Sequence, residues 1–249
     1  MKIVIIGGSG FIGSKLVAEL RRHGHSVIAA SQTSGLRTVE EEELAEILKT
    51  AEVVIDVANA PLAEDKAMME FFQTSGRNLL AAETIAGVKH HITLSVVGIE
   101  HMQGSGYFRA KMAQESLVKG SEIPYTILQT TQLFESVRGI AQSATTDEQI
   151  RISNASVQPV ASEEVAAVII ALSVGAPLNI TVQLAGPERM KLDELIRVFL
   201  RETNDPRKLI TDKHALYFGV EIDDQSLIPE ENARLGKIRF IDWLRRQDK

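Results

Sequence analysis

The chain has 249 residues, of which 44% are hydrophobic and 24% are charged, the composition of an ordinary folded protein with enough residues for one large core. The net charge of −6 and the lack of a basic stripe argue against a nucleic-acid-binding surface, and the lack of cysteine excludes disulfides, thiolate catalysis and cysteine-bound metals. The apolar run after Met1 and Lys2 is too short for a signal peptide, and no run approaches the roughly 20 apolar residues of a membrane-spanning helix, so we expect a cytoplasmic protein with no nucleic-acid or membrane partner.

The first predicted element is a buried strand over 3–6, which a glycine-rich turn follows directly. The turn reads Gly7-Gly8-Ser9-Gly10-Phe11-Ile12-Gly13, and a helical pattern continues from it through His23. Strand, glycine turn and helix in this order are typical of the phosphate-binding turn of a dinucleotide site, because glycines let backbone N–H groups approach a pyrophosphate at the positive end of the helix. The alternative is a surface turn that binds nothing, which the flanking strand and helix disfavour.

Alternating strands and helices continue through the first half of the chain. Gly87 ends the longest helix, at a position where glycine is common. Repeated strand–helix units predict an α/β fold with a doubly wound parallel sheet of the Rossmann type and helices on both faces. We predict strands over 26–31, 53–57, 91–95 and 125–129, a short strand over 36–39, and helices over 40–49, 64–86 and 107–119.

Beyond residue 130 the alternation is less regular. Ser162 is of the residue type that caps helices, and Glu163 and Glu164 suit the positive end of the helix that it would begin. We see no repeat or flexible linker, so we predict a single Rossmann-type domain with a dinucleotide-binding core over 1–130 and a dependent C-terminal substrate-binding lobe over 131–249. The elements predicted in this lobe are helices over 130–141, 162–172, 192–200 and around Trp243, and strands over 151–153 and 180–184.

The end of the second strand bears on which dinucleotide is bound. An NAD site usually places an acidic residue about 20 residues after the glycines to bind ribose hydroxyls, but no acidic residue lies between Glu19 and Glu40. Ser31 and Gln32 end the strand and Arg37 follows; hydroxyls donate to a 2′-phosphate and a guanidinium pairs with it. We therefore expect NADP rather than NAD, with these three residues among its ligands. A polar turn that faces water is an equally good interpretation of Ser31 and Gln32.

Four further side chains are candidates for the same site. In Tyr107-Phe108-Arg109-Ala110-Lys111 a phenol and an ammonium lie four residues apart, on one face of the predicted helix. Ser95 ends the strand before this helix, at the carboxyl edge where ligands of open α/β folds bind. Asn59 follows the strand over 53–57 and is expected beside the cofactor; a strand-terminating turn explains it equally well.

These segments resemble the short-chain dehydrogenase/reductase superfamily, and most closely its atypical, NmrA-like branch of NAD(P)-binding proteins. The resemblance implies that Ser95 polarises a substrate carbonyl, that Tyr107 is the general acid or base, and that Lys111 binds the nicotinamide ribose and lowers the pKa of the tyrosine. The cofactor supplies the hydride, so the protein orients the carbonyl and manages one proton. The residues that carry the resemblance are the glycine turn over 7–13, Val54-Ile55-Asp56-Val57-Ala58-Asn59, Leu94-Ser95-Val96-Val97-Gly98 and the segment over 107–111.

The expected function is NADP-dependent reduction of a small carbonyl or quinone-like substrate. Many NmrA-like proteins lack the tyrosine and act as cofactor-sensing regulators, so the alternative is a non-catalytic NADP(H) sensor with a regulatory protein partner. A sugar-nucleotide epimerase or dehydratase would share the three residues but usually needs a longer C-terminal lobe. Each residue also has a structural interpretation: Ser95 as a turn cap, Tyr107 as a packed ring with a hydrated hydroxyl, and Lys111 as a solvated residue that pairs with Glu115.

The remaining candidates are weaker. His90, His91 and His101 have no partner at the spacing of metal ligands, so we expect no metal site. Four residues beyond the last strand of the core are candidates to line the substrate pocket, of which the last suits the core equally well: Thr130, Thr131, Gln132 and Phe134.

Overall fold

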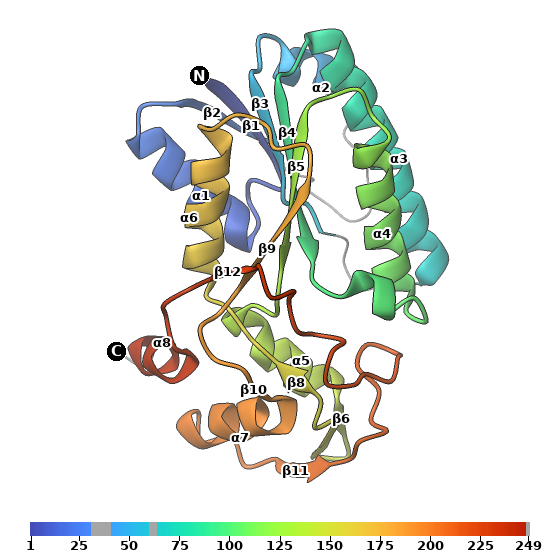
Figure 1. Cartoon of the computed structure of the whole chain (residues 1–249), viewed down its shortest axis with the longest axis vertical. Helices are drawn as coiled ribbons and strands as arrows, with labels where there is room; N and C mark the ends of the chain where they lie inside the picture. The colour runs from blue at the N-terminus through green and yellow to red at the C-terminus, as the bar shows by residue number, and fades with distance from the viewer. Residues whose placement is uncertain (31–40, 60–63, 248–249) are drawn as a thin grey trace. The chain divides into compact units, whose positions relative to one another are not determined.

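The computed structural model describes residues 1–30, 41–59 and 64–247, with the side chains of 41–43 left out (Figure 1). The chain forms two compact units whose segments alternate along the sequence, so that neither unit is a single continuous stretch. Unit 1 comprises Met1–Ser95, Gly106–Leu128 and Val165–Val182, and unit 2 comprises Val96–Ser105, Gln129–Glu164 and Gln183–Lys249.

Unit 1 is built on a parallel sheet. Its strand order is β9-β5-β4-β3-β1-β2, and Ile3 pairs in parallel register with both Val27 and Val53. Apolar runs such as Ile3–Ile6 form these strands because the strands are buried on both faces. The bounds are β1 Lys2–Ile6, β2 Ser26–Ala30, β3 Val53–Asp56, β4 His90–Val96, β5 Tyr125–Thr130 and β9 Thr181–Ala185.

Helices cover both faces of this sheet, as the predicted doubly wound fold requires (Figure 1). On one face lie α1 (Phe11–Arg22) and α6 (Ser162–Ser173). On the other face α3 (Asp65–Ala86) packs against α4 (Gly106–Lys119), and α2 (Glu41–Leu48) contacts α3. Gly87 ends α3 in the left-handed conformation, with φ +70°, which confirms its predicted role. The strand predicted over 36–39 lies outside the described residues.

Unit 2 contains short strands and helices, several of which bury apolar side chains. The strand pairs are β11-β7-β6, β10-β8, and β12 with the end of β9. One face of α7 is buried along its length, and Phe134 packs edge-on against Phe240 at 5.2 Å between ring centres. The elements are η1 Ile99–His101, η2 Phe134–Ser136, α5 Val137–Ser143, β6 Thr145–Thr146, β7 Gln149–Ile152, β8 Ser156–Val157, β10 Met190–Lys191, α7 Leu192–Glu202, β11 Lys208–Thr211, β12 Arg234–Leu235 and α8 Phe240–Gln247.

Two predictions for this part of the chain are wrong. The helix predicted over 130–141 starts only at Phe134, because Thr130 still belongs to β5 and Leu133 forms a parallel bridge with Val160. Ser162 does begin α6, but its hydroxyl donates to Glu135 Oε1 at 2.6 Å, so the group expected to cap the helix contacts a neighbouring segment.

Among the helices that the structure describes, none combines the length and the apolar character that crossing a membrane requires.

Candidate functional site

The glycine turn between β1 and α1 is packed too tightly for any other residue. Gly7 has φ +81°, and a Cβ on it would lie 2.8 Å from the backbone nitrogen of Ala58. A Cβ on Gly8 would lie 2.7 Å from that of Ala29, and one on Gly13 only 2.1 Å from the Gly7 carbonyl oxygen. The turn therefore rests directly on β2 and on the end of β3, which glycine alone permits.

The N-terminus of α1 has the features of an anion site. Gly10 precedes the helix in an extended conformation and offers no side-chain cap, and the first N–H groups of a helix have no carbonyl partner within it. These donors and the helix dipole favour a phosphate. The Lys15 ammonium lies 5.0 Å from the centre of the Phe11 ring in the same first turns. The residues present thus fit the pyrophosphate of a dinucleotide.

Replacing Gly13 by alanine is expected to weaken NADPH binding at least about tenfold, because the turn must open and lose one or more charge-assisted hydrogen bonds. Gly139→Ala is the matched control, since a Cβ there meets no atom within 4 Å. We expect this control to keep full affinity and to raise the free energy of unfolding by about 0.5–1 kcal/mol. A fluorescence titration with NADPH measures the affinities of the wild type and both variants. An affinity of Gly13→Ala equal to that of the wild type would show that the turn does not hold the pyrophosphate.

A pocket opens beside the glycine turn, within unit 1. It is bordered by Ile6 and Ala58 at the ends of β1 and β3, by Phe72 and Asn78 on α3, and by Gln114 on α4. Apolar walls with a few amide groups are typical of sites for flat organic ligands.

The three predicted catalytic residues come from two neighbouring elements, β4 and α4. Ser95 is 2% exposed, and its hydroxyl has no hydrogen-bond partner among the described residues. The Lys111 ammonium donates to the carbonyl oxygen of Leu94 at 2.9 Å, immediately before Ser95 in β4. Tyr107 lies one helical turn before Lys111, and its side chain hydrogen-bonds with that of Asn59. The structure therefore places the Lys111 ammonium at Leu94, the residue before Ser95 in β4. It places the Tyr107 side chain in contact with that of Asn59.

Lys111 is buried, so the interpretation of it as a solvated residue is wrong. Its side chain is 3% exposed, and its ammonium also donates to Gln114 Oε1 at 2.5 Å and lies 5.1 Å from the centre of the Phe72 ring. Burial lowers the pKa of Lys111 to about 8, while the carboxylates of Asp56 and Glu115 act in the opposite direction. Lys111 is thus an ammonium at neutral pH that titrates in mildly alkaline solution.

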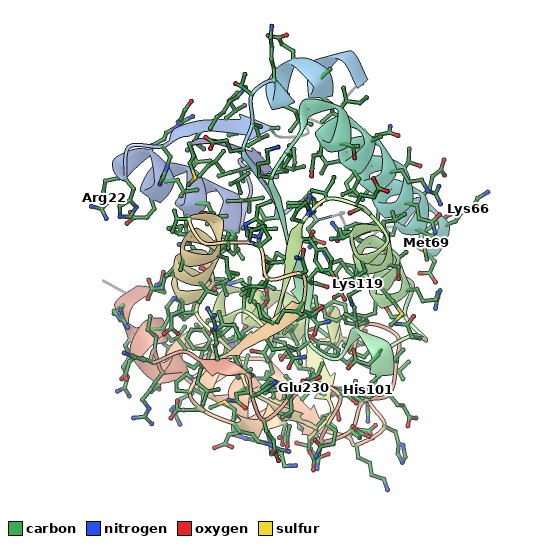
Figure 2. The ribbon with its side chains drawn as sticks, turned by 45° about the horizontal axis from the view of Figure 1, so that its top comes forward. Arg22, Lys66, Met69, His101, Lys119 and Glu230 are labelled. Carbon is green, nitrogen blue, oxygen red and sulfur yellow. The ribbon has the colours of Figure 1, made fainter. Side chains whose placement is uncertain are left out.

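Tyr107 differs from what the resemblance implies. Its ring packs against an apolar cluster of α3 and α4, which Met69 of α3, labelled in Figure 2, also joins. Burial raises the pKa of Tyr107 to about 12, and the hydrogen bond with Asn59 offsets only part of that shift. Lys111 does not lower this pKa as the resemblance implies; its ammonium donates to the Leu94 carbonyl oxygen and to Gln114 Oε1. The phenol therefore keeps its proton at pH 7 and is a weaker acid than an unperturbed tyrosine.

The other predicted residues divide into two groups. Ser31, Gln32 and Arg37 lie outside the described residues. In unit 2, Thr131 donates its hydroxyl hydrogen to the Gln158 carbonyl oxygen at 2.6 Å. The side-chain amide of Gln132 is buried without a partner among the described residues. Phe134 is a core residue, packed against α8.

Sequence analysis missed two residues of the site, Asp56 and Gln114. Gln114 donates from Nε2 to Asp56 Oδ2 at 2.8 Å and thereby connects the lysine to β3. One signal was present in the sequence: Asp56 interrupts the apolar run over 53–57, where a buried acid needs a specific partner. Nothing in the sequence pointed to Gln114 as that partner.

The comparison with protein families agrees with this geometry. A family model described as NAD(P)H-binding matches residues 7–173, which includes the glycine turn, the end of β3, Ser95 and all of α4. The chain belongs to this NAD(P)H-binding family. Its cofactor is therefore a nicotinamide dinucleotide.

Individual relatives are distant. The photosystem II assembly factor Ycf39 of Synechocystis sp. is 21% identical over 153 residues, which are 56% of this chain and 47% of that protein. The chain thus spans about half the length of this curated relative.

Two solved structures show the same fold at 16% identity and a TM-score of 0.73. The dTDP-4-dehydrorhamnose reductase of Bacillus anthracis, in complex with NADP, is matched over 98% of this chain and 97% of its own. MoeE5, in complex with UDP-glucose and NAD, is matched over 100% of both chains. At this identity the likeness concerns the fold alone.

Proposed function

We propose that this chain is an NADP-dependent reductase of the short-chain dehydrogenase/reductase type, of the NmrA-like branch, which acts on a small carbonyl or quinone-like substrate. The observation that carries the proposal is the Lys111 ammonium on the Leu94 carbonyl oxygen, next to the buried and unpartnered hydroxyl of Ser95. A buried hydroxyl without a partner costs free energy. Its persistence here supports a role in donating to a substrate oxygen.

The three side chains then divide the chemistry. Ser95 donates a hydrogen bond to the substrate carbonyl, and Tyr107 donates a proton to the oxygen as negative charge develops on it. Lys111 contributes a positive charge and a donor for the ribose of the dinucleotide. The dinucleotide supplies the hydride when it is bound. In the reducing direction this proton comes from the Tyr107 phenol, which is protonated at pH 7.

The preference for NADP rests on the acid-free segment between Glu19 and Glu40. Arg37→Ala is expected to weaken NADPH binding about 10- to 100-fold, the equivalent of one charge-assisted contact with the 2′-phosphate. Affinity for NADH, which lacks that phosphate, serves as the internal control and is expected to stay the same. A parallel loss for both cofactors would argue against a phosphate contact at Arg37, and tighter wild-type binding of NADH would overturn the preference.

The test of the function is turnover. Purified protein is mixed with NADPH and a panel of aldehydes, ketones and quinones, and the loss of NADPH absorbance is followed. Oxidation that depends on one class of substrate supports the proposal. Tight NADPH binding without oxidation across the whole panel would contradict it.

The cytoplasmic location stays a prediction.

The second candidate is a redox sensor that binds NADP(H) and a regulatory protein partner. The observation that favours it is the raised pKa of Tyr107, since burial has not tuned this phenol for proton transfer near neutrality. A sensor must bind the oxidised and the reduced cofactor with different affinities, because a ligand shifts an equilibrium only through differential binding. Calorimetry with NADP⁺ and NADPH measures this difference, and equal affinities would exclude the sensor.

A further inference from the structure

Asp56 is a buried acid whose two oxygens have different partners. It is 6% exposed and ends β3. Its Oδ1 accepts a hydrogen bond from the backbone N–H of Ala58 at 3.0 Å, and its Oδ2 accepts one from Gln114 Nε2 at 2.8 Å. A carboxylate is the only side chain of this size that offers two acceptor oxygens at once.

The contact with Asp56 fixes which end of the Gln114 amide faces Lys111. Because the carboxylate accepts from Nε2, the amide oxygen is the atom that remains for the lysine, and it lies 2.5 Å from Lys111 Nζ. The ammonium is thereby held between this oxygen and the Leu94 carbonyl oxygen. The flipped amide would direct its NH₂ group at the ammonium, which has no acceptor for it.

The other oxygen of Asp56 holds the turn that follows β3. Ala58, whose N–H it accepts, immediately precedes Asn59, and the Asn59 side chain hydrogen-bonds with Tyr107. One carboxylate is thus connected through Gln114 to the lysine of the site and through the backbone to the partner of its tyrosine.

We infer that Asp56 is a positioning residue, which holds the Lys111 ammonium beside Ser95 through Gln114 and holds the Asn59 turn through the Ala58 N–H. The inference rests on the proposed function for the role of Lys111. It adds two residues, Asp56 and Gln114, whose role is to hold Lys111 and the Asn59 turn in place.

Asparagine cannot replace Asp56 in this arrangement. Its amide has a single acceptor oxygen, so Asp56→Asn can satisfy either Ala58 or Gln114. If the oxygen faces Ala58, the NH₂ group faces Gln114 and favours the flipped amide that repels Lys111. If the oxygen faces Gln114, the NH₂ group opposes the N–H of Ala58 and the Asn59 turn must move.

Loss of the Asp56 charge also has a defined electrostatic sign. A negative neighbour favours the ammonium form, so its removal lowers the pKa of Lys111 from its value of about 8. Glu115 of α4 acts in the same direction and is paired with Lys119, labelled in Figure 2, at 2.8 Å. The groups that face Lys111 or Asp56 are Glu115 and Gln114 of α4, the Leu94 carbonyl of β4, the Phe72 ring of α3 and, through Asp56, the Glu83–His91 pair of α3 and β4.

The direct test is a lysine-selective side-chain NMR titration of the full chain. The Lys111 signal is assigned by its loss in Lys111→Met. We expect its midpoint near pH 8 in the wild type and at a clearly lower pH in Asp56→Asn. Gln114→Leu removes the acceptor and keeps the acid, and is also expected to lower the midpoint. If Asp56→Asn does not fold, Gln114→Leu alone decides. Unchanged midpoints in the variants that fold would overturn the inference.

Turnover separates this inference from the proposed function. The rate of NADPH oxidation is measured as a function of pH. Its decline on the alkaline side, the alkaline limb, is expected to move to lower pH together with the NMR midpoint. Glu164→Gln is the control, because it neutralises a carboxylate that accepts hydrogen bonds from the backbone N–H groups of Lys237 and Ile238 and is not among the groups that face Lys111 or Asp56; we expect an unmoved limb. If the NMR midpoint shifts but the wild type oxidises no NADPH, the proposed function fails and the positioning role stands. If turnover is present and its limb stays in place, the positioning role fails and the proposed function stands.

Discussion

Replacing Tyr107 by phenylalanine is expected to slow NADPH oxidation about 100- to 10,000-fold, the usual contribution of a positioned general acid. The ring would keep its place in the apolar cluster of α3 and α4, so the fold and the affinity for NADPH are expected to change little. The loss should appear in kcat rather than in KM, because the proton is transferred only as the hydride moves. Steady-state kinetics and an NADPH titration of the same sample measure both quantities.

Tyr125→Phe is the matched control for this variant. Tyr125 begins β5 in the same unit, and its backbone N–H donates to Asn179 Oδ1, a contact that the substitution leaves in place. We expect this control to keep wild-type turnover. Unchanged turnover in Tyr107→Phe would remove the phenol from the mechanism and favour the sensor, whereas a loss in both variants would indicate a general effect on folding.

The sheet of unit 1 was predictable because its signals are local. Short segments rich in β-branched and aromatic residues, each followed along the chain by a helical pattern, define β1, β3, β4 and β5. Glycines at positions where a Cβ would meet backbone atoms mark the turn after β1. Residues near each other in the sequence decide all of these features, so the fold class and the edge of the sheet that carries the site follow from the sequence.

The second half was less predictable because its elements depend on distant partners. Strands of two residues, such as β8 and β10, have no periodicity to detect and exist through their pairing with each other. Leu133 lies in a segment with helical composition but is extended, because it pairs with Val160. Tertiary contacts override local preference at such positions.

The charge states of the site could not be predicted from spacing. The spacing of four positions from Tyr107 to Lys111 places both on one helix face, but spacing does not show which acceptors compete for the ammonium. Asp56 and Gln114 are 58 residues apart in the sequence and meet only in the folded chain. Burial, a property of the whole fold, then sets the pKa of Tyr107 and that of Lys111 in opposite directions from their usual values.

A buried ion pair elsewhere in unit 1 is expected to have the largest effect on stability. His91 of β4 lies with Nδ1 2.9 Å from Glu83 Oε1, and its Nε2 lies 2.6 Å from the hydroxyl of Thr93. Glu83 is 0% and His91 1% exposed. Either Glu83→Leu or His91→Leu leaves the other group buried without its partner and is expected to cost about 3–5 kcal/mol. Urea unfolding at pH 7 measures the loss.

The double variant Glu83→Leu/His91→Leu separates the pair from simple truncation. It leaves no unpaired charge, so we expect it to lose clearly less than the two single losses added together, with the Thr93 hydroxyl as the main group left unsatisfied. Additive losses would show that the two residues do not act as a pair.

The pH dependence of the same pair supplies an independent measurement. Burial raises the pKa of Glu83; burial alone would lower the pKa of His91, but the Glu83 carboxylate raises it above its ordinary value of about 6.5. Both raised pKa values make the folded protein bind more protons than the unfolded chain. The part contributed by His91 is complete below its ordinary pKa and declines as pH rises through its folded pKa, while the part contributed by Glu83 declines from the ordinary pKa of that acid upward. The wild type should thus lose stability relative to the double variant between pH 6 and pH 9. If the stability of the wild type relative to the double variant instead grows with pH, His91 is neutral in the folded protein.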